Sequence, residues 1–410
     1  MGKPVELLRM PENGDNYVPA ADFLRVLSIL LISWFHIWQQ SWLNPLFRLG
    51  GREVNLLGVV RTGYIMVDIM LVISGFLLFL PYANAKLDGR SFPGVRSFYK
   101  KRAVRILPPY FLCLVIYLAV YILPNNPYPN AAYMWKDILG HFTFTQTWTA
   151  EAYIGTKFPA VLWTLAVEVQ FYLIAPLVCR CFAKKPLLTY LVMTAAALMY
   201  RNLYVLPMND CNIWFNRLPA MLDVYANGML AAYAVTYLKR KKDLPNLLSV
   251  LVGTAGVVVC IAVLYLISRL AIRQSYISGY EEIRHGQMEI RYVLSLLGGL
   301  FLVSGTAASL WFQKVLGNRV IRFLSAVSYN YYIWHSHCML RLKAWHFPPY
   351  ENEMPQMAGE QPWQQHYTLL CFAFALVTAV LLTYLFEKPV TKKLTEWIKK
   401  WDQQRIGNPK

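Results

Sequence analysis

The sequence predicts an all-α integral membrane protein, a bundle of about ten transmembrane helices. Hydrophobic residues make up 57% of its 410 residues and charged residues only 15%, whereas a soluble globular protein carries about 25% charged residues. The apolar residues gather in runs of about 20, the length that an α-helix needs to cross the hydrocarbon core. The 13 Trp and 27 Tyr residues suit the aromatic belts at the two faces of a membrane.

The predicted spans follow one another along the chain, and polar or proline-containing loops separate them. They cover residues 22–43, 62–82, 103–123, 163–183, 187–206, 218–238, 246–268, 291–312, 323–343 and 366–386. The longest gap, 124–162, is too short for an appended soluble domain.

Lysine and arginine concentrate in every second loop, which sets the expected orientation. The basic loops are 83–102, 184–185, 239–242 and 314–322. Because cytoplasmic loops carry the excess of Lys and Arg and the number of spans is even, we expect both termini in the cytoplasm. We therefore expect a cytoplasmic tail at 1–20, a ten-helix membrane domain at 21–390 and a basic cytoplasmic tail at 391–410. No cleavable signal is visible at the N-terminus, so we expect the first span to act as the insertion signal.

Composition also argues against other classes of protein. The net charge of +18 lies mostly in short loops between apolar runs, so no nucleic-acid partner is expected. The seven Cys residues form no CxxC pair, and neither a disulfide framework nor a metal site is predicted. The sequence contains no GxSxG elbow, no Walker A loop and no HxxxxD arrangement.

The first span carries a cation near its start, Arg25, and an imidazole near its end, His36. Eleven residues of α-helix make about three turns, so both lie on one face, about 16 Å apart along the axis. Ionisable groups inside a membrane segment usually face the bundle interior and serve function. The structural alternative is an arginine that reaches the membrane surface and a hydrogen-bonded core histidine.

Four ionisable groups from four spans are expected at one depth, nearer the outer surface. They are His36, Asp68, Glu168 and His335, about 8–12 Å below that surface at about 1.5 Å per residue. Asp68 needs a partner, which His36 or an arginine could supply. Asp68 precedes Ser74–Gly75, a small-residue pair that would otherwise only let helices approach closely.

A basic segment, Lys101–Pro108, opens the third span. Arg102 and Arg105 lie one turn apart and share a helix face. Two guanidinium groups in this arrangement can clamp a phosphate or pyrophosphate. The alternative is simple anchoring at the cytoplasmic surface.

The ninth span is unusually polar and aromatic, with the sequence SYNYYIWHSH over residues 328–337. His335 and His337 are two residues apart and point to different sides of a helix, which argues against a shared metal ion. By depth, His335 is the inward residue.

In order and spacing, these motifs resemble the membrane acyltransferase family 3. The matching features are Arg25-x10-His36, VDIMLVISGF at 67–76, KRAVRILP at 101–108, WTLAVEVQFY at 163–172, SYNYYIWH at 328–335 and FEKP at 386–389. The resemblance covers residues 20–390. The chain departs from the family at Val169, where a second acid often follows the one at Glu168.

The resemblance implies transfer of an acyl group, commonly acetyl from acetyl-CoA, to a hydroxyl or amino group outside the cytoplasm. Acceptors in the family are polysaccharides, lipid-linked sugars, peptidoglycan or small molecules. The family's functional Arg and His of the first span map to Arg25 and His36, and its later arginines map to Arg102 and Arg105. Some members carry an additional hydrolase-like domain; without one, we expect the membrane domain to complete the reaction or to hand over to another protein.

We therefore expect an acyl-CoA-dependent O-acyltransferase in the bacterial plasma membrane, without a metal cofactor. Its partners would be membrane lipids, acyl-CoA and a hydroxylated acceptor, and a homo-oligomer is compatible with the sequence. Phosphate binding is expected from Arg25, Lys101, Arg102 and Arg105. His36 is expected to act as general base, oriented by Glu168 or Asp68. The oxyanion is expected to be stabilised by Tyr329, Trp163 or His335. A covalent acyl-histidine stays open.

The main alternative function is a transporter or flippase for a glycan or lipid intermediate. Its buried charges would then line a substrate or proton path. Such a protein has no natural role for a phosphate clamp at the inner surface. A second alternative is the other large membrane acyltransferase superfamily, which pairs a buried His with a distant Asn, but the first-span position of His36 beside Arg25 argues against it.

Overall fold

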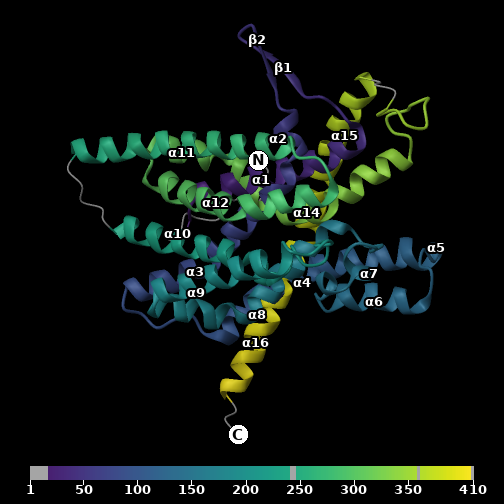
Figure 1. Cartoon of the computed structure of the whole chain (residues 1–410). Coiled ribbons are helices and arrows are strands. Elements are labelled where there is room, and N and C mark those ends of the chain that lie inside the picture. Colours follow the sequence, from purple (N-terminus) through teal and green to yellow (C-terminus); the bar gives the residue numbers. More distant parts are fainter. Residues whose placement is uncertain (1–16, 241–245, 358–360, 408–410) are drawn as a thin grey trace, which may run out of the picture.

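A computed structural model describes residues 17–240, 246–357 and 361–407. Within these ranges all regular secondary structure is helical apart from one two-stranded hairpin (Figure 1). The longer helices are α1 (Pro19–Ser41), α3 (Met66–Leu87), α4 (Val95–Ile116), α6 (Ala131–Phe142), α8 (Trp163–Lys184), α9 (Pro186–Met199), α10 (Leu222–Arg240), α11 (Asn246–Ser275), α12 (Tyr280–Ala307), α14 (Arg319–Ala344), α15 (Gln361–Leu381) and α16 (Lys388–Gly407). The shorter elements are α2 (Leu57–Arg61), α5 (Leu123–Asn125), α7 (Ala150–Tyr153), α13 (Leu310–Leu316), β1 (Leu46–Leu49) and β2 (Arg52–Asn55), with the 3-10 turns η2 (Gly63–Ile65), η4 (Gln146–Trp148), η5 (Ala160–Leu162) and η7 (Leu218–Met221) and the π-helical turns η3 (Tyr117–Ile122), η6 (Tyr200–Val205) and η8 (Leu382–Glu387).

The structure confirms an all-α protein with membrane-spanning helices. Among the described residues, 7 helical segments are long and apolar enough to cross a membrane. They are Pro19–Ser41, Gly63–Leu87, Val95–Asn125, Ala160–Lys184, Leu247–Ser275, Tyr280–Ala307 and Pro362–Gln404. The other predicted spans also lie on helices, namely α9 with η6, α10 and α14. Charged and amide side chains, such as Arg201 and Asp223, make these segments less apolar.

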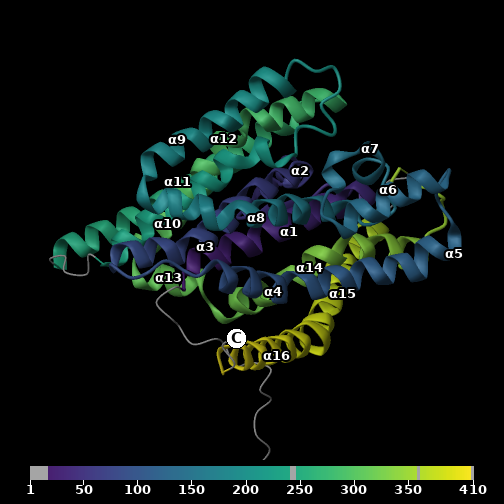
Figure 2. The same ribbon diagram turned by 90° about the horizontal axis from the view of Figure 1, so that it is seen from below.

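Several predicted boundaries differ from the structure. The predicted span 291–312 is wrong at both ends, because α12 begins at Tyr280 and ends at Ala307, before a break and α13. The loop 44–60 contains the hairpin β1–β2, and the gap 124–162 contains α5, α6 and α7. Both views place α5, α6 and α7 together at one end of the bundle (Figures 1 and 2). The predicted C-terminal tail is helical as far as Gly407, and its residues 408–410 lie outside the described residues, as do residues 1–16 of the N-terminal tail.

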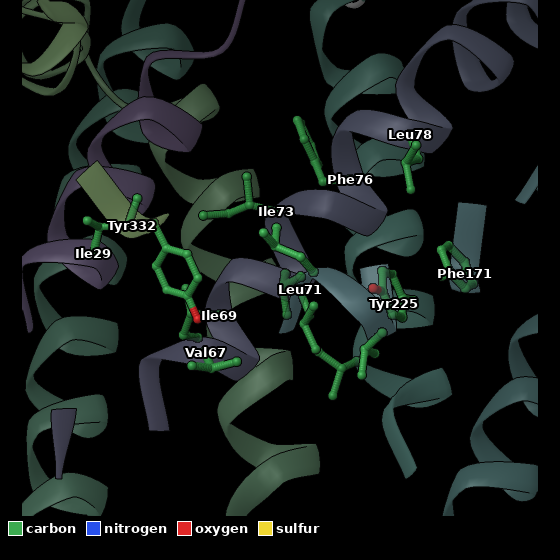
Figure 3. Close-up of a cluster of buried hydrophobic side chains, with 14 of the residues drawn as sticks. Ile29, Val67, Ile69, Leu71, Ile73, Phe76, Leu78, Phe171, Tyr225 and Tyr332 are labelled. Carbon is green, nitrogen blue, oxygen red and sulfur yellow. The ribbon is translucent and has the colours of Figure 1, made fainter. Parts of the chain in front are cut away.

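Helix α3 forms the centre of the bundle and contacts α1, α8, α10 and α12. Its contact with α10 is very close, because a Cβ atom added at Gly75 would lie 2.5 Å from the Tyr225 carbonyl oxygen, and one at Gly228 would lie 2.1 Å from that of Val72. Glycine at both positions lets the two backbones approach. Around this contact lies the apolar cluster of Figure 3, in which side chains of α3 such as Phe76 and Leu78 lie near Tyr225 and Phe171.

Candidate active site

A cavity of about 110 Å³ between α1, α3, α4, α8 and α14 carries a strong excess of positive charge. We call it the basic cavity. Its ionisable lining residues are Arg25, Arg102, Arg105, Glu168, Tyr172, Tyr329 and Tyr332. The sequence pattern predicts phosphate binding by the arginines of this set, and the fold brings them together although Arg25 is far from the others along the chain.

Only part of this positive charge is balanced inside the protein. Arg25 donates to Asp22 Oδ1 at 3.2 Å and to Ser325 Oγ at 2.9 Å. Arg102 lies over the rings of Phe98 and Tyr172. Arg105 is exposed and has neither a hydrogen bond nor an ion pair with another described residue. The guanidinium groups of Arg102 and Arg105 are therefore available to bind a phosphate.

Glu168 is the acid of the basic cavity. Its Oε1 accepts a hydrogen bond from Ser74 Oγ at 2.8 Å and another from the Tyr172 hydroxyl. The expected contact with His36 is absent from the structure. Trp163 at the start of α8 lines the cavity of His36, but Glu168 is about 7.5 Å further along the helix and lines the basic cavity instead.

Lys101 lies apart from the basic cavity. It is exposed and lines a groove between the start of α4 and α16. Arg102 lies about 100° further around α4, as consecutive residues of a helix do, and lines the basic cavity.

A second and larger cavity, of about 550 Å³, contains His36. We call it the histidine cavity. Nδ1 of His36 lies 3.0 Å from Oε1 of Gln39. Because an amide oxygen only accepts hydrogen bonds, Nδ1 of a neutral imidazole carries the proton in this arrangement and Nε2 keeps its lone pair. Nε2 of the half-buried His36 side chain is thus available to accept a proton.

His335 lies directly behind His36, with 5.4 Å between the ring centroids. Its Nδ1 donates to the Tyr332 carbonyl oxygen at 2.7 Å, and its buried Nε2 has no hydrogen-bond partner among the described residues. The side chain lines neither the basic cavity nor the histidine cavity. The structure therefore confirms that His36 and His335 lie close together. His335 packs against His36, which lines the wall of the histidine cavity.

The predicted oxyanion donors differ in whether their polar hydrogen already donates to an acceptor within the protein. Tyr329 donates its hydroxyl proton to the Ile106 carbonyl oxygen at 2.9 Å. Trp163 lines the histidine cavity, and its indole N–H has no acceptor in the described part of the chain. Of the predicted donors, Trp163 alone combines a place beside His36 with an unused N–H.

The two cavities meet at Val67 and Tyr332, which line both. Figure 3 shows the Tyr332 ring with its hydroxyl directed toward Val67. The hydroxyl is held by Thr164 Oγ1 at 2.9 Å and by the Val161 carbonyl oxygen at 3.1 Å. The side chains of Val67 and Tyr332 therefore form a wall that the two cavities share.

Asp68 is paired with Arg291 of α12, not with His36. Both side chains are fully buried, and Arg291 Nε lies 3.2 Å from Asp68 Oδ1. Arg291 also donates to the Phe215 carbonyl oxygen and to Asn216 Oδ1. Since a buried charge requires a partner of opposite sign, this arrangement accounts for Asp68 without a contact to the base. Of the two partners that the sequence left open for Asp68, an arginine is therefore the one present, and Asp68 does not orient His36.

Sequence reasoning missed a neighbouring ion pair between Arg201 and Asp223. The two arms of the buried guanidinium lie 2.8 and 2.6 Å from the two carboxylate oxygens. Both residues stand inside predicted spans, so opposite charges in adjacent spans were the signal that could have found the pair.

Gln39 is a further residue that the sequence pattern did not single out, and we expect it to position His36. Gln39→Met removes the acceptor for Nδ1–H, so we expect about a tenfold lower kcat, the cost of about one hydrogen bond, with an unchanged KM for the acyl donor. Gln39→Glu keeps an acceptor and is expected to retain most of the rate. Steady-state kinetics of both variants test this; an equal loss in both would contradict a positioning role.

The chain matches the acyltransferase domain of the acyltransferase 3 family over residues 18–388. It therefore belongs to this family of acyltransferases, as its motifs predicted.

Curated relatives agree with this class. A Staphylococcus aureus (strain COL) protein, provisionally named an O-acetyltransferase, is 22% identical over 338 residues, which cover 78% of this chain and 50% of the relative. The peptidoglycan O-acetyltransferase OatA of Listeria monocytogenes is 22% identical over 78% of this chain and 49% of its own length. A provisionally named acetyltransferase of Acidianus two-tailed virus is 25% identical over 78% of this chain and 83% of its own length. The chain spans about half the length of the bacterial relatives. No solved structure matches it significantly.

Proposed function

We propose that this chain is a membrane O-acyltransferase that moves an acetyl group from cytoplasmic acetyl-CoA to a hydroxyl group outside the cytoplasm. The observation that carries the proposal is the meeting of the basic cavity and the histidine cavity at Val67 and Tyr332. The proposal includes a membrane domain of about ten spans with both termini in the cytoplasm, in the plasma membrane of a bacterium.

The acyl donor would bind at the basic cavity. Phosphates of CoA carry several negative charges, and neither Arg102 nor Arg105 forms a salt bridge with a described carboxylate. Arg25 would contribute a further positive charge from α1. Lys101 lies in the groove between α4 and α16 and would contact only a phosphate that extends out of the basic cavity. The narrow pantetheine arm would then place the thioester near Tyr332.

The acceptor would enter the histidine cavity, where His36 acts as general base. Nε2 of His36 takes the proton of the acceptor hydroxyl, and the oxygen attacks the thioester carbonyl carbon. The tetrahedral intermediate collapses, the C–S bond breaks, and the CoA sulfur receives the proton from His36. The acetyl ester and free CoA are the products, so no oxidant or further reactant is needed.

The negative charge that develops on the carbonyl oxygen requires a donor. Trp163 can supply its free indole N–H from the wall of the histidine cavity. Tyr329 would need to give up its bond to Ile106, and His335 would need to be protonated at Nε2. We therefore propose Trp163 as the main donor, with Glu168 holding Tyr172 and Ser74 at the donor site.

The acceptor class is a hydroxylated glycan, a lipid-linked sugar or a small molecule. The histidine cavity supports a polar acceptor, because Gln39, Arg61, Asn212, Asn216 and Gln287 are among its lining residues. The named activity of one relative, O-acetylation of peptidoglycan, belongs to the same chemical class.

Acetyl-CoA binding tests the donor assignment. Arg102→Ala is expected to weaken binding by about 10- to 100-fold, because a hydrogen bond to a charged group contributes about 1.5–3 kcal/mol. Arg319→Ala, which removes an exposed arginine at the start of α14, serves as the control and should bind normally. Equilibrium binding to the purified chain measures both. Absence of binding to the unaltered chain would favour a transporter or flippase instead.

A further inference from the structure

A cysteine, a glutamate and a histidine meet at the edge of the histidine cavity. Cys211 lies in the segment between η6 and η7, and Glu281 and His285 lie one turn apart on α12, so they share a face of that helix. The potential ligand atoms of the three residues all lie within 4.8 Å of one another. The acyl transfer proposed above uses none of them.

Hydrogen bonding within the group leaves one side of it unsatisfied. Cys211 Sγ lies 3.1 Å from Glu281 Oε2, while Asn212 Nδ2 donates to Oε1 at 3.2 Å. Nε2 of His285 and Oδ1 of Asn212 are buried, yet neither has a hydrogen-bond partner among the described residues. A buried polar atom without a partner costs about 1–3 kcal/mol, so such atoms on His285 and on the neighbour of Cys211 are consistent with a missing ligand.

The charges and atom types indicate which ligand fits. A thiolate and a carboxylate together carry two negative charges, which balance one divalent cation. Zn²⁺ prefers sulfur, imidazole nitrogen and carboxylate oxygen, often with only three protein ligands and water in the fourth position. Arg284 lies 3.8 Å from Glu281 Oε1, whereas Oε2 of Glu281 faces the Cys211 sulfur.

We propose that Cys211, Glu281 and His285 bind one Zn²⁺ ion. On binding, the metal displaces the Cys211 thiol proton, which leaves to solvent, and a Zn–S bond forms. Water would take the fourth position.

Such an ion would link the segment before η7 to the first turns of α12. Asn212, Phe215 and Asn216 of that segment line the histidine cavity, and so do Arg284 and Gln287 of α12. The metal would therefore hold one wall of this cavity in place. Sequence spacing could not indicate the site, because Cys211 is 70 residues from Glu281.

Metal content of the purified full chain tests the proposal independently of any transferase activity. The protein is stripped with a chelator, incubated with Zn²⁺ or Co²⁺ and desalted, and bound metal is measured by mass spectrometry. We expect about one ion per chain and, with Co²⁺, a thiolate-to-cobalt charge-transfer band. Retention of no metal, or of Co²⁺ without that band, would overturn the proposal.

Variants identify the ligands. Cys211→Ser and His285→Ala are expected to lose the stoichiometric metal and the cobalt band. Cys181→Ser, which replaces an exposed cysteine of α8, is the matched control and should behave like the parent chain. Size-exclusion profiles show whether each variant is folded. Unchanged metal binding in both ligand variants would contradict the assignment.

Discussion

Replacing His36 with alanine is expected to lower the rate of acetyl transfer by about 10²- to 10⁴-fold, the usual contribution of a positioned general base. Binding of acetyl-CoA should persist, because His36 lies in the histidine cavity and the arginines lie in the basic cavity. Turnover and equilibrium binding, measured on the same preparation, separate the two effects.

His366→Ala is the matched control for this variant. His366 is exposed on α15 and lines neither cavity, so its loss should leave the rate unchanged. Mass spectrometry of the acid-quenched enzyme examines the covalent route, since an acetyl group on His36 would make it a nucleophile. A His36→Ala variant with the parent rate would remove His36 from the mechanism altogether.

Replacing Arg201 with methionine is expected to have the largest effect on stability. The variant leaves Asp223 as a fully buried and unpaired carboxylate, and such a change costs about 3–5 kcal/mol. We expect the variant to unfold at a clearly lower temperature or to be recovered in low yield. Thermal unfolding, followed by size-exclusion fluorescence, provides the measurement.

The double variant Arg201→Met/Asp223→Leu distinguishes an ion pair from other effects of a changed residue. Removing both charges also removes the unpaired carboxylate, so stability should recover in part. Arg319→Met changes an exposed arginine and should be neutral. A double variant no more stable than Arg201→Met would show that the pair is not what stabilises this region.

The class of fold and most of the helices could be predicted from the sequence, because an apolar run of about 20 residues is the length that a membrane-spanning helix requires. The shared face of Arg102 and Arg105 followed from helical spacing and needed no tertiary information. The hairpin β1–β2 and the start of α12 at Tyr280 could not be placed, since their polar residues resemble an ordinary loop.

Depth along each span was a poor guide to side-chain contacts. His36 and His335 are neighbours as expected. Asp68, however, forms an ion pair with Arg291, and Glu168 lines the basic cavity. A depth count gives the level of a residue but not the direction in which its side chain points. Gln39 was missed for a related reason, because an amide in a polar helix end carries no distinctive signal.

Release of free CoA thiol by the purified chain tests the central claim most directly. Acetyl-CoA is supplied with a panel of hydroxylated acceptors, and the parent is compared with His36→Ala and Arg102→Ala. Our account predicts release by the parent, loss of release with binding retained in His36→Ala, and weakened binding in Arg102→Ala. A parent chain that neither binds nor consumes acetyl-CoA would contradict the account and favour a transporter.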